Sequence, residues 1–260
     1  MAYGVTIQDF PGEGCAIVFG GSGGLGLATA GLLAERGCNV VATYRSRREP
    51  VDELVAAVRK LGRGAIGLEC DVTKRDSVDR VVSEALKEYG RIHTVVSAGG
   101  LVFDTGPFVE FKDESFRGVI EIDVFGFFNI SKAVVPALRA GGGGSITALI
   151  TCAVNRTVPL DALSATPKSA VSMMVRHLAA EEGQNGIRAN AVGPGVVDGG
   201  MVIPMMKTQT KELLEMAVGV TPLGRLGECS EIAEAVAFLA SSKAAYVSGQ
   251  LLMVDGGLSA

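Results

Sequence analysis

Three glycines near the N-terminus have a spacing that suits phosphate binding. Gly20, Gly24 and Gly26 lie in the run CAIVFGGSGGLGLATAGLLAERG, which has the pattern of a strand, a glycine-rich turn and a helix. Glycines let the backbone approach a pyrophosphate closely, and the following helix directs N–H groups and the positive end of its dipole at that anion. The motif lies in the first strand–turn–helix unit of the chain, so it indicates a dinucleotide-binding turn rather than merely a tight one.

The next apolar run, NVVATYRSRR, ends on a basic residue. Arg45 stands where an NAD-binding protein carries an acidic residue that hydrogen-bonds both ribose hydroxyls. A guanidinium pairs well with a 2′-phosphate and gains little from a plain ribose, so the sequence favours NADP(H), with NAD(H) as the alternative. The competing interpretation is that Arg45 and Arg47 are solvated surface charges.

The elements that must position these residues follow one rhythm along the chain. Short apolar runs alternate with helix-length amphipathic segments, which predicts an α/β fold: a Rossmann-type doubly wound parallel sheet of about seven strands with helices on both faces. We expect strands at 15–20, 39–44, 65–69, 93–97, 145–150, 187–192 and 250–254, and helices at 25–36, 51–61, 77–89, 116–138, 164–182 and 230–239. Glycines at 37, 62, 90 and 141 stand where helices should stop.

Length and composition narrow the class of protein. A chain of 260 residues suits one α/β domain spanning 1–260, and 24 basic residues dispersed among 28 acidic ones argue against a nucleic-acid surface. No run approaches the roughly 18 apolar residues of a membrane span, and no signal peptide is visible. Five cysteines without CxxC spacing fit a reducing cytoplasm. His93 and His177 lack the partners of a metal site, so we expect no metal.

The segment 199–226 breaks the alternation. It contains four of the eight methionines, at positions 201, 205, 206 and 216, among turn residues. Methionine is unbranched and adaptable, so the segment could close as a lid over an apolar small-molecule substrate. Ordinary packing or a subunit contact is the alternative.

Several motifs, in this order along the chain, resemble those of the short-chain dehydrogenase/reductase family. GGSGGLG is similar to the family's TGxxxGxG, Cys70-Asp71-Val72 to its adenine-contacting acidic pair, and Ser97-Ala98-Gly99 to its NNAG; RANAV then leads into Pro194-Gly195, and YVSGQLLMVDGG resembles the C-terminal strand. The resemblance covers nearly the whole chain. It implies a nicotinamide cofactor and a homotetramer or homodimer. The candidate cofactor-binding residues are Gly20, Ser22, Gly23, Gly24, Leu25, Gly26, Arg45, Ser46, Asp71, Val72, Ser97, Ala98, Gly99, Lys168, Pro194, Gly195 and Val197.

The same resemblance marks a departure at the catalytic positions. Members that interconvert alcohols and ketones use a tyrosine, a lysine four residues later, a serine thirteen residues before the tyrosine and an asparagine on the preceding long helix. Aligned on Lys168, the tyrosine position is Ser164, the serine position is Thr151 and the asparagine position is Asp123. An aliphatic hydroxyl is far less acidic than a phenol of pKa about 10 and is shorter by a ring. The chain therefore resembles a divergent member without the active-site tyrosine, and these four residues are its candidate catalytic residues.

Three functions stay open at this stage. In a modified NADP(H)-dependent oxidoreductase acting on an apolar carbonyl or enoyl substrate, Lys168 holds the ribose, Thr151 or Ser164 orients the carbonyl, and Asp123, Cys152 or water supplies the proton. Dienoyl-thioester reductases of the family also have serine four residues before the lysine, although they carry another tyrosine after the fifth strand. A non-redox elimination, isomerisation or decarboxylation would use Asp123 and Lys168 as acid and base. A catalytically silent NADP-binding homologue would act through an active partner.

Overall fold

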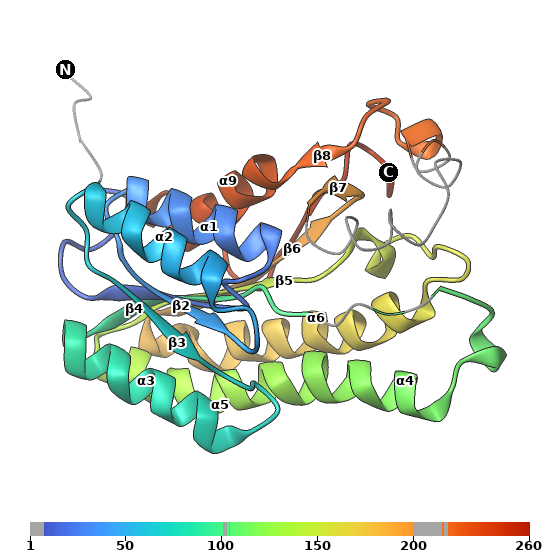
Figure 1. Ribbon diagram of the computed structural model, residues 1–260. Coiled ribbons are helices and arrows are strands. Elements are labelled where there is room, and N and C mark those ends of the chain that lie inside the picture. The colour runs from blue at the N-terminus through green and yellow to red at the C-terminus, as the bar shows by residue number, and fades with distance from the viewer. Residues whose placement is uncertain (1–7, 101–102, 104, 200–214, 216–217) are drawn as a thin grey trace.

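A parallel sheet of seven strands runs through the middle of the computed structural model, which describes residues 8–100, 103, 105–199, 215 and 218–260. The order across the sheet is β3-β2-β1-β4-β5-β6-β9 (Figure 1). This is the predicted Rossmann-type doubly wound fold, which is thereby confirmed. The strands are β1 (Cys15–Phe19), β2 (Asn39–Tyr44), β3 (Ala65–Glu69), β4 (Ile92–Ser97), β5 (Gly144–Leu149), β6 (Ile187–Pro194) and β9 (Leu251–Val254).

Helices cover both faces of this sheet (Figure 1). One face carries α1 (Gly24–Glu35), α2 (Glu49–Lys60) and α9 (Cys229–Ala240); the other carries α3 (Arg75–Tyr89), α5 (Gly126–Ala140) and α6 (Ala162–Glu182). Successive side chains of a strand point to opposite faces, so β1 contributes side chains to the hydrophobic core on each face of the sheet. Ile17 and Phe19 pack with α3, α5 and α6, whereas Ala16 and Val18 pack with α1 and α9.

The structure refines the predicted elements in four places. The expected helix at 116–138 is α4 (Asp113–Val119) and α5 joined by a π-helical turn at Ile120–Phe125. A two-stranded sheet of β7 (Val197–Asp198) and β8 (Gly227–Glu228) was not predicted. Gly141 ends α5 with a φ of −80°, and the left-handed residue is Gly142 instead, with a φ of 80°. Helix α6 begins at Ala162, two residues before the predicted start at 164, and Pro167 lies in its second turn.

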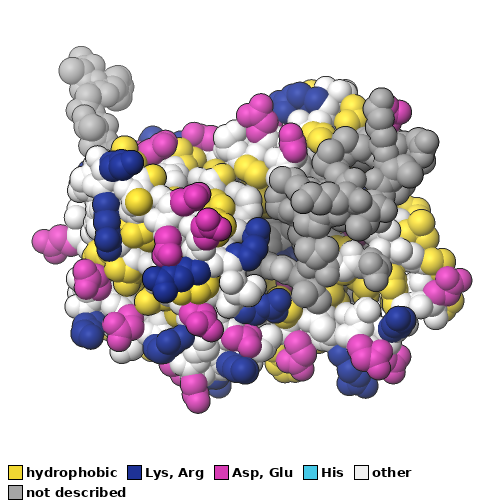
Figure 2. All heavy atoms as spheres, in the orientation of Figure 1, with side chains coloured by type: hydrophobic (Ala, Val, Ile, Leu, Met, Phe, Trp, Pro, Cys, Tyr) yellow, Lys and Arg dark blue, Asp and Glu magenta, His cyan; other side chains and the backbone are white. Residues whose placement is uncertain are grey.

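Figure 2 shows basic and acidic side chains interspersed over the visible face, as the balanced composition suggests. No helix within the described residues is long and apolar enough to cross a membrane.

Arg188 ties the start of β6 to the end of α9. Its guanidinium donates hydrogen bonds to the carbonyls of Leu239, Ala240, Ser241 and Val247 at 2.6, 3.1, 3.0 and 3.3 Å. The last carbonyls of a helix have no partner within it, so these bonds satisfy groups that would otherwise be unpaired. We expect Arg188→Met to lower the free energy of unfolding by about 2–4 kcal/mol, measured by urea unfolding.

Arg176 on α6 is the matched control, because its side chain is exposed. Arg176→Met should change the free energy of unfolding by less than about 0.5 kcal/mol. Equal losses in the two variants would show that the hydrogen bonds of Arg188 contribute little.

Candidate active site

The predicted site residues gather at the carboxyl ends of the strands, where β1 and β4 lie side by side. From β1 the strand order runs outward through β2 and β3, and from β4 it runs the other way through β5 and β6. Ligands of open parallel sheets bind at such a switch point. The turns after β1 and β4 touch there. A Cβ added to Gly20 would lie 2.6 Å from the amide nitrogen of Gly99, and the Ala98 amide donates a hydrogen bond to the Phe19 carbonyl at 2.8 Å.

The turn after β1 leaves the beginning of α1 open to an anion. Gly23 precedes the helix without a side-chain cap, and the first turn holds no acidic residue. A Cβ on Gly26 would lie only 2.3 Å from the Gly20 carbonyl oxygen, so the helix packs against the turn at a distance that only glycine allows. These uncapped N–H groups and the positive end of the helix dipole suit a diphosphate.

Polar side chains flank this turn from the ends of β2 and β3. Arg47 donates a hydrogen bond from Nη2 to the Ser22 carbonyl at 2.7 Å, a contact that sequence reasoning missed. Asp71 accepts bonds from the Thr73 amide at 3.1 Å and hydroxyl at 2.7 Å. Burial opposes ionisation of Asp71, but these bonds and nearby positive charges, Arg45 among them, hold its pKa below the ordinary value. Arg45 itself is exposed.

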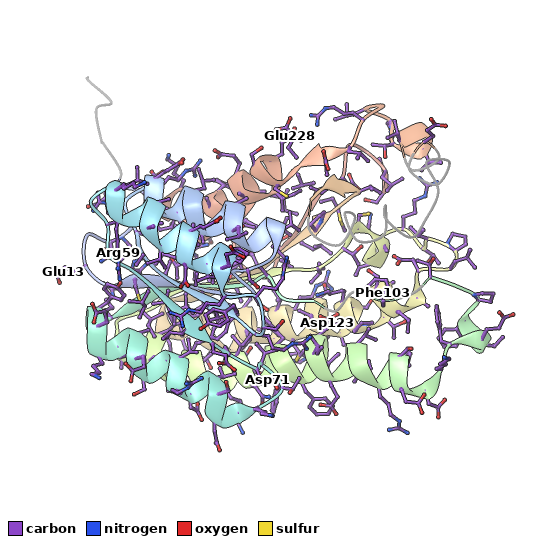
Figure 3. All side chains as sticks on the ribbon, viewed as in Figure 1. Glu13, Arg59, Asp71, Phe103, Asp123 and Glu228 are labelled. Carbon is purple, nitrogen blue, oxygen red and sulfur yellow. The ribbon has the colours of Figure 1, made fainter. Side chains whose placement is uncertain are left out.

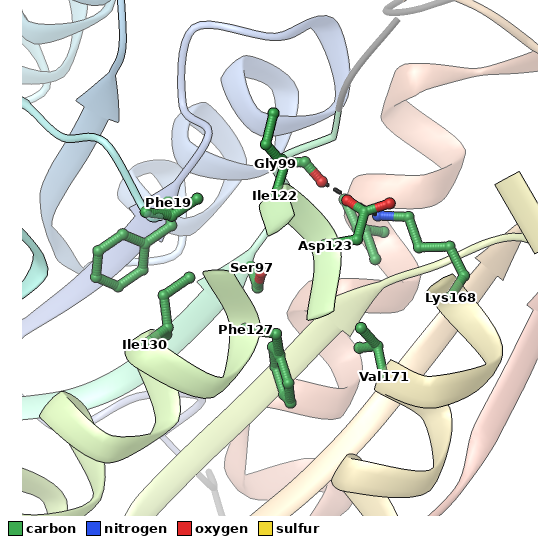
Figure 4. Close-up of a pocket in the computed structure, with 11 residues that line it drawn as sticks. Phe19, Ser97, Gly99, Ile122, Asp123, Phe127, Ile130, Lys168 and Val171 are labelled. Atoms are coloured by element: carbon green, nitrogen blue, oxygen red, sulfur yellow. Dashed lines mark hydrogen bonds and ion pairs between the residues drawn. The ribbon is translucent and has the colours of Figure 1, made fainter. Parts of the chain in front are cut away.

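Lys168 and Asp123 meet in the interior of the site. The Lys168 ammonium donates to the Asp123 carboxylate at 3.0 Å and to the Gly99 carbonyl at 3.3 Å (Figure 4). Both side chains are buried, with 7% and 6% of each residue exposed. Asp123 comes from the π-helical turn, a feature often found at functional sites. Figure 3 shows Asp71 and Asp123 toward the carboxyl ends of the strands, away from Glu13 and Arg59.

A cavity of about 20 Å³ lies beside this ion pair, which is enough for one water molecule. Its polar lining consists of Ser97, Gly99, Asp123 and Lys168. A water there has several hydrogen-bond partners.

Thr151 and Ser164 supply hydroxyl groups near the end of β5 and in the first turn of α6. Thr151 Oγ1 accepts from the Ala153 amide at 3.2 Å, which leaves its own hydrogen available to donate. Ser164 is 7% exposed and lies one helical turn before Lys168 on the same face of α6. Sequence reasoning missed Asp161, the residue just before α6, where burial raises the pKa of the carboxyl to about 6.

The remaining candidates lie as follows. Burial raises the pKa of the Cys152 thiol to about 11, so this proposed proton source stays protonated at neutral pH. Pro194 ends β6, and the Gly195 amide donates to the Val254 carbonyl at 3.0 Å. Val197 is a residue of β7. Most of the predicted lid, 199–226, lies outside the described residues.

Comparison with known proteins agrees with this geometry. Residues 20–259 match a family model described as enoyl-(acyl carrier protein) reductase. The 3-oxoacyl-[acyl-carrier-protein] reductase of Thermotoga maritima is 34% identical over 95% of this chain and 98% of its own length. The chain belongs to the short-chain dehydrogenase/reductase family.

Two further members of the family are also similar to this chain. The peroxisomal 2,4-dienoyl-CoA reductase of Pongo abelii is 34% identical over 93% of this chain and 82% of its own length. The structure of a 7α-hydroxysteroid dehydrogenase complexed with NADH and 7-oxo glycochenodeoxycholic acid is 30% identical, with a TM-score of 0.88 and coverage of 96% and 95%. By name these relatives are dehydrogenases and reductases, that is, oxidoreductases. The family resemblance that the order of the sequence motifs indicated is therefore confirmed.

Proposed function

We propose that this protein is an NADP(H)-dependent reductase of apolar enoyl or carbonyl compounds that works without the active-site tyrosine. The observation that carries the proposal is the buried Lys168–Asp123 pair, directly beside an uncapped glycine turn at the switch point. When bound, the reduced nicotinamide supplies a hydride to the substrate. The chain itself binds and orients the two molecules and provides a proton.

Each proposed role follows from the position of the side chain. Lys168 is held in one place by its hydrogen bond to Asp123, so its ammonium can bind the nicotinamide ribose. Thr151 and Ser164 orient the substrate oxygen through their hydroxyl groups. Asp123 accepts from Lys168 and lines the water-sized cavity, and we propose that a water molecule held there exchanges protons with this pair.

Enoyl substrates are favoured over simple ketones. Ketone reduction needs a strong proton donor at the carbonyl oxygen, and an isolated serine is a poor one. The relatives include a 2,4-dienoyl-CoA reductase, and the matching family model is named for an enoyl reductase.

The test combines binding with turnover. Calorimetry with NADPH and NADH measures cofactor affinity, and absorbance then follows consumption of the reduced cofactor with a panel of ketones and enoyl thioesters. We expect NADPH to be consumed with enoyl thioesters. Tight binding with no consumption for any substrate would refute reductase activity and favour a non-redox enzyme or a silent homologue.

Arg45 offers a test of cofactor preference. Arg45→Ala should weaken NADPH binding about 10–100-fold and leave NADH binding unchanged, because only NADPH carries the 2′-phosphate. The matched control is Arg48→Ala, since the Arg48 guanidinium pairs with Asp52 at 3.0 Å instead. Parallel weakening of both cofactors would contradict the proposed role of Arg45.

We further propose a homodimer or homotetramer, to be measured by light scattering. Phe125, Phe128 and Met173 expose about half of their surface on neighbouring elements of one face of the sheet. At the edge strand β9, Leu252 is also exposed.

The five cysteines are all unpaired, which supports the proposed cytoplasmic location.

A further inference from the structure

The segment 155–160 joins the two candidate hydroxyl groups of the site. Thr151 lies before it, just past the end of β5, and Ser164 lies after it, in the first turn of α6. All six residues of the segment are exposed. An exposed segment has few packing contacts to hold it, so its path depends on hydrogen bonds.

Two side chains tie the beginning of this segment to the C-terminus of the chain. Arg156 Nη1 donates a hydrogen bond to the Leu258 carbonyl at 2.5 Å. Beside it, Asn155 Nδ2 donates to the Ser259 carbonyl at 3.1 Å. These bonds join residues more than 100 positions apart in the sequence.

The far end of the segment is fixed as well. Among the described residues, Leu160 is the one non-glycine residue with a positive φ, at 69°. Such backbone strain persists only where the surroundings enforce it. The Leu160 carbonyl accepts a hydrogen bond from the Gly106 amide at 3.0 Å, which ties this end to the segment that follows β4.

The C-terminal turn, residues 255–260, is a well-fixed partner for Arg156. The Asp255 carboxylate accepts from the Gly257 amide at 3.0 Å, and from the Ser259 amide and hydroxyl at 2.9 and 2.5 Å. Gly257 has a φ of 86°, which glycine adopts without strain. The Leu258 side chain is buried. The carbonyl that Arg156 contacts therefore belongs to an ordered turn and not to a loose end of the chain.

Main-chain hydrogen bonds carry this tie back to Thr151. The amides of Asn155 and Arg156 donate to the Cys152 carbonyl at 2.9 and 3.2 Å. The next amide, that of Ala153, donates to Thr151 Oγ1 at 3.2 Å. Residues 151–156 thus form one compact turn, and a shift of Arg156 would move the Thr151 hydroxyl with it.

We propose that Arg156 and Asn155 are positioning residues, which direct the Thr151 hydroxyl at the substrate by tying the turn after β5 to the C-terminal turn. This inference rests on the proposed reductase function, in which Thr151 orients the substrate oxygen. Both residues act through Thr151 and have no proposed contact with the substrate or the cofactor.

Kinetics provide the first test. Arg156→Ala should lower kcat for an enoyl thioester about 10–100-fold with KM little changed, because a shift of about 1 Å in an orienting group has an effect of this size. The affinity for NADPH should stay the same, since the glycine turn lies after β1. Arg156→Lys keeps a donor for the Leu258 carbonyl and should restore most of kcat. Arg176→Ala, at an exposed position on α6, is the matched control.

The second test needs neither cofactor nor substrate. In the ligand-free protein, NMR measures hydrogen exchange of the Ala153 amide, the donor to Thr151 Oγ1. Exchange should be at least about tenfold faster in Arg156→Ala than in the wild type, and unchanged in Arg176→Ala. Amides within β5 should keep their wild-type rates, because only a general loss of stability would accelerate them too.

A truncated protein identifies the partner of Arg156. Deletion of residues 258–260 removes both carbonyl acceptors, so Arg156→Ala should lower kcat no further in the truncated protein. An undiminished effect of Arg156→Ala there, or wild-type exchange of the Ala153 amide in Arg156→Ala, overturns the inference. Wild-type protein that reduces no substrate overturns the proposed function, and the exchange rates then decide alone whether the C-terminal turn fixes Thr151.

Discussion

Lys168→Met should lower the free energy of unfolding by about 3–5 kcal/mol at neutral pH and kcat/KM for reduction by about 1000-fold. The loss of stability follows because the variant leaves the Asp123 carboxylate buried without its cation, and an unpaired buried charge is strongly destabilising. The loss of activity follows because Lys168 is the group proposed to hold the nicotinamide ribose. Urea unfolding and steady-state kinetics measure the two effects separately.

The double variant Asp123→Leu/Lys168→Met separates charge burial from packing. Replacing both members of a buried pair by apolar residues is often neutral, so this variant should recover most of the lost stability while remaining inactive. Lys60→Met, at the exposed end of α2, is the control and should leave both properties unchanged. A loss of less than about 1 kcal/mol in Lys168→Met would show that Asp123 is solvated once its partner is removed.

The sheet could be predicted because the residues that mark each strand are close together in the sequence. Each of the seven strands was placed to within about two residues, since a strand of a parallel sheet covered by helices is a short apolar run with turn residues at its ends. The glycine-rich turn could be predicted in the same way, because the close approach of the helix to the Gly20 carbonyl requires glycine at position 26. Residues close in sequence carry all of this information.

The contacts of the site depend on residues far apart in sequence. The family resemblance identified Asp123 and Lys168 as candidate catalytic residues. The 3.0 Å contact between their side chains depends on a π-helical turn, which no local sequence pattern predicted.

Gly26→Ala should raise the dissociation constant for NADPH at least 100-fold and lower the free energy of unfolding by about 1–3 kcal/mol. The new methyl group would lie 2.3 Å from the Gly20 carbonyl oxygen and 3.1 Å from Gly21 Cα, so α1 and the turn must move apart. That movement withdraws the first N–H groups of α1 from the diphosphate they are proposed to bind. Calorimetry measures the affinity and urea unfolding the stability.

Gly31→Ala makes the same chemical change one and a half turns further along α1. Its methyl group would meet only Leu54 Cδ1, at 3.9 Å, so we expect unchanged NADPH affinity and a gain of about 0.5–1 kcal/mol from the better helix propensity of alanine. We therefore expect opposite changes in the free energy of unfolding for the two variants. A loss of NADPH affinity in Gly26→Ala alone would locate the diphosphate at the turn. Equal NADPH affinity in both variants would place the cofactor elsewhere, because the turn after β1 cannot accept a methyl group at position 26 and keep its shape.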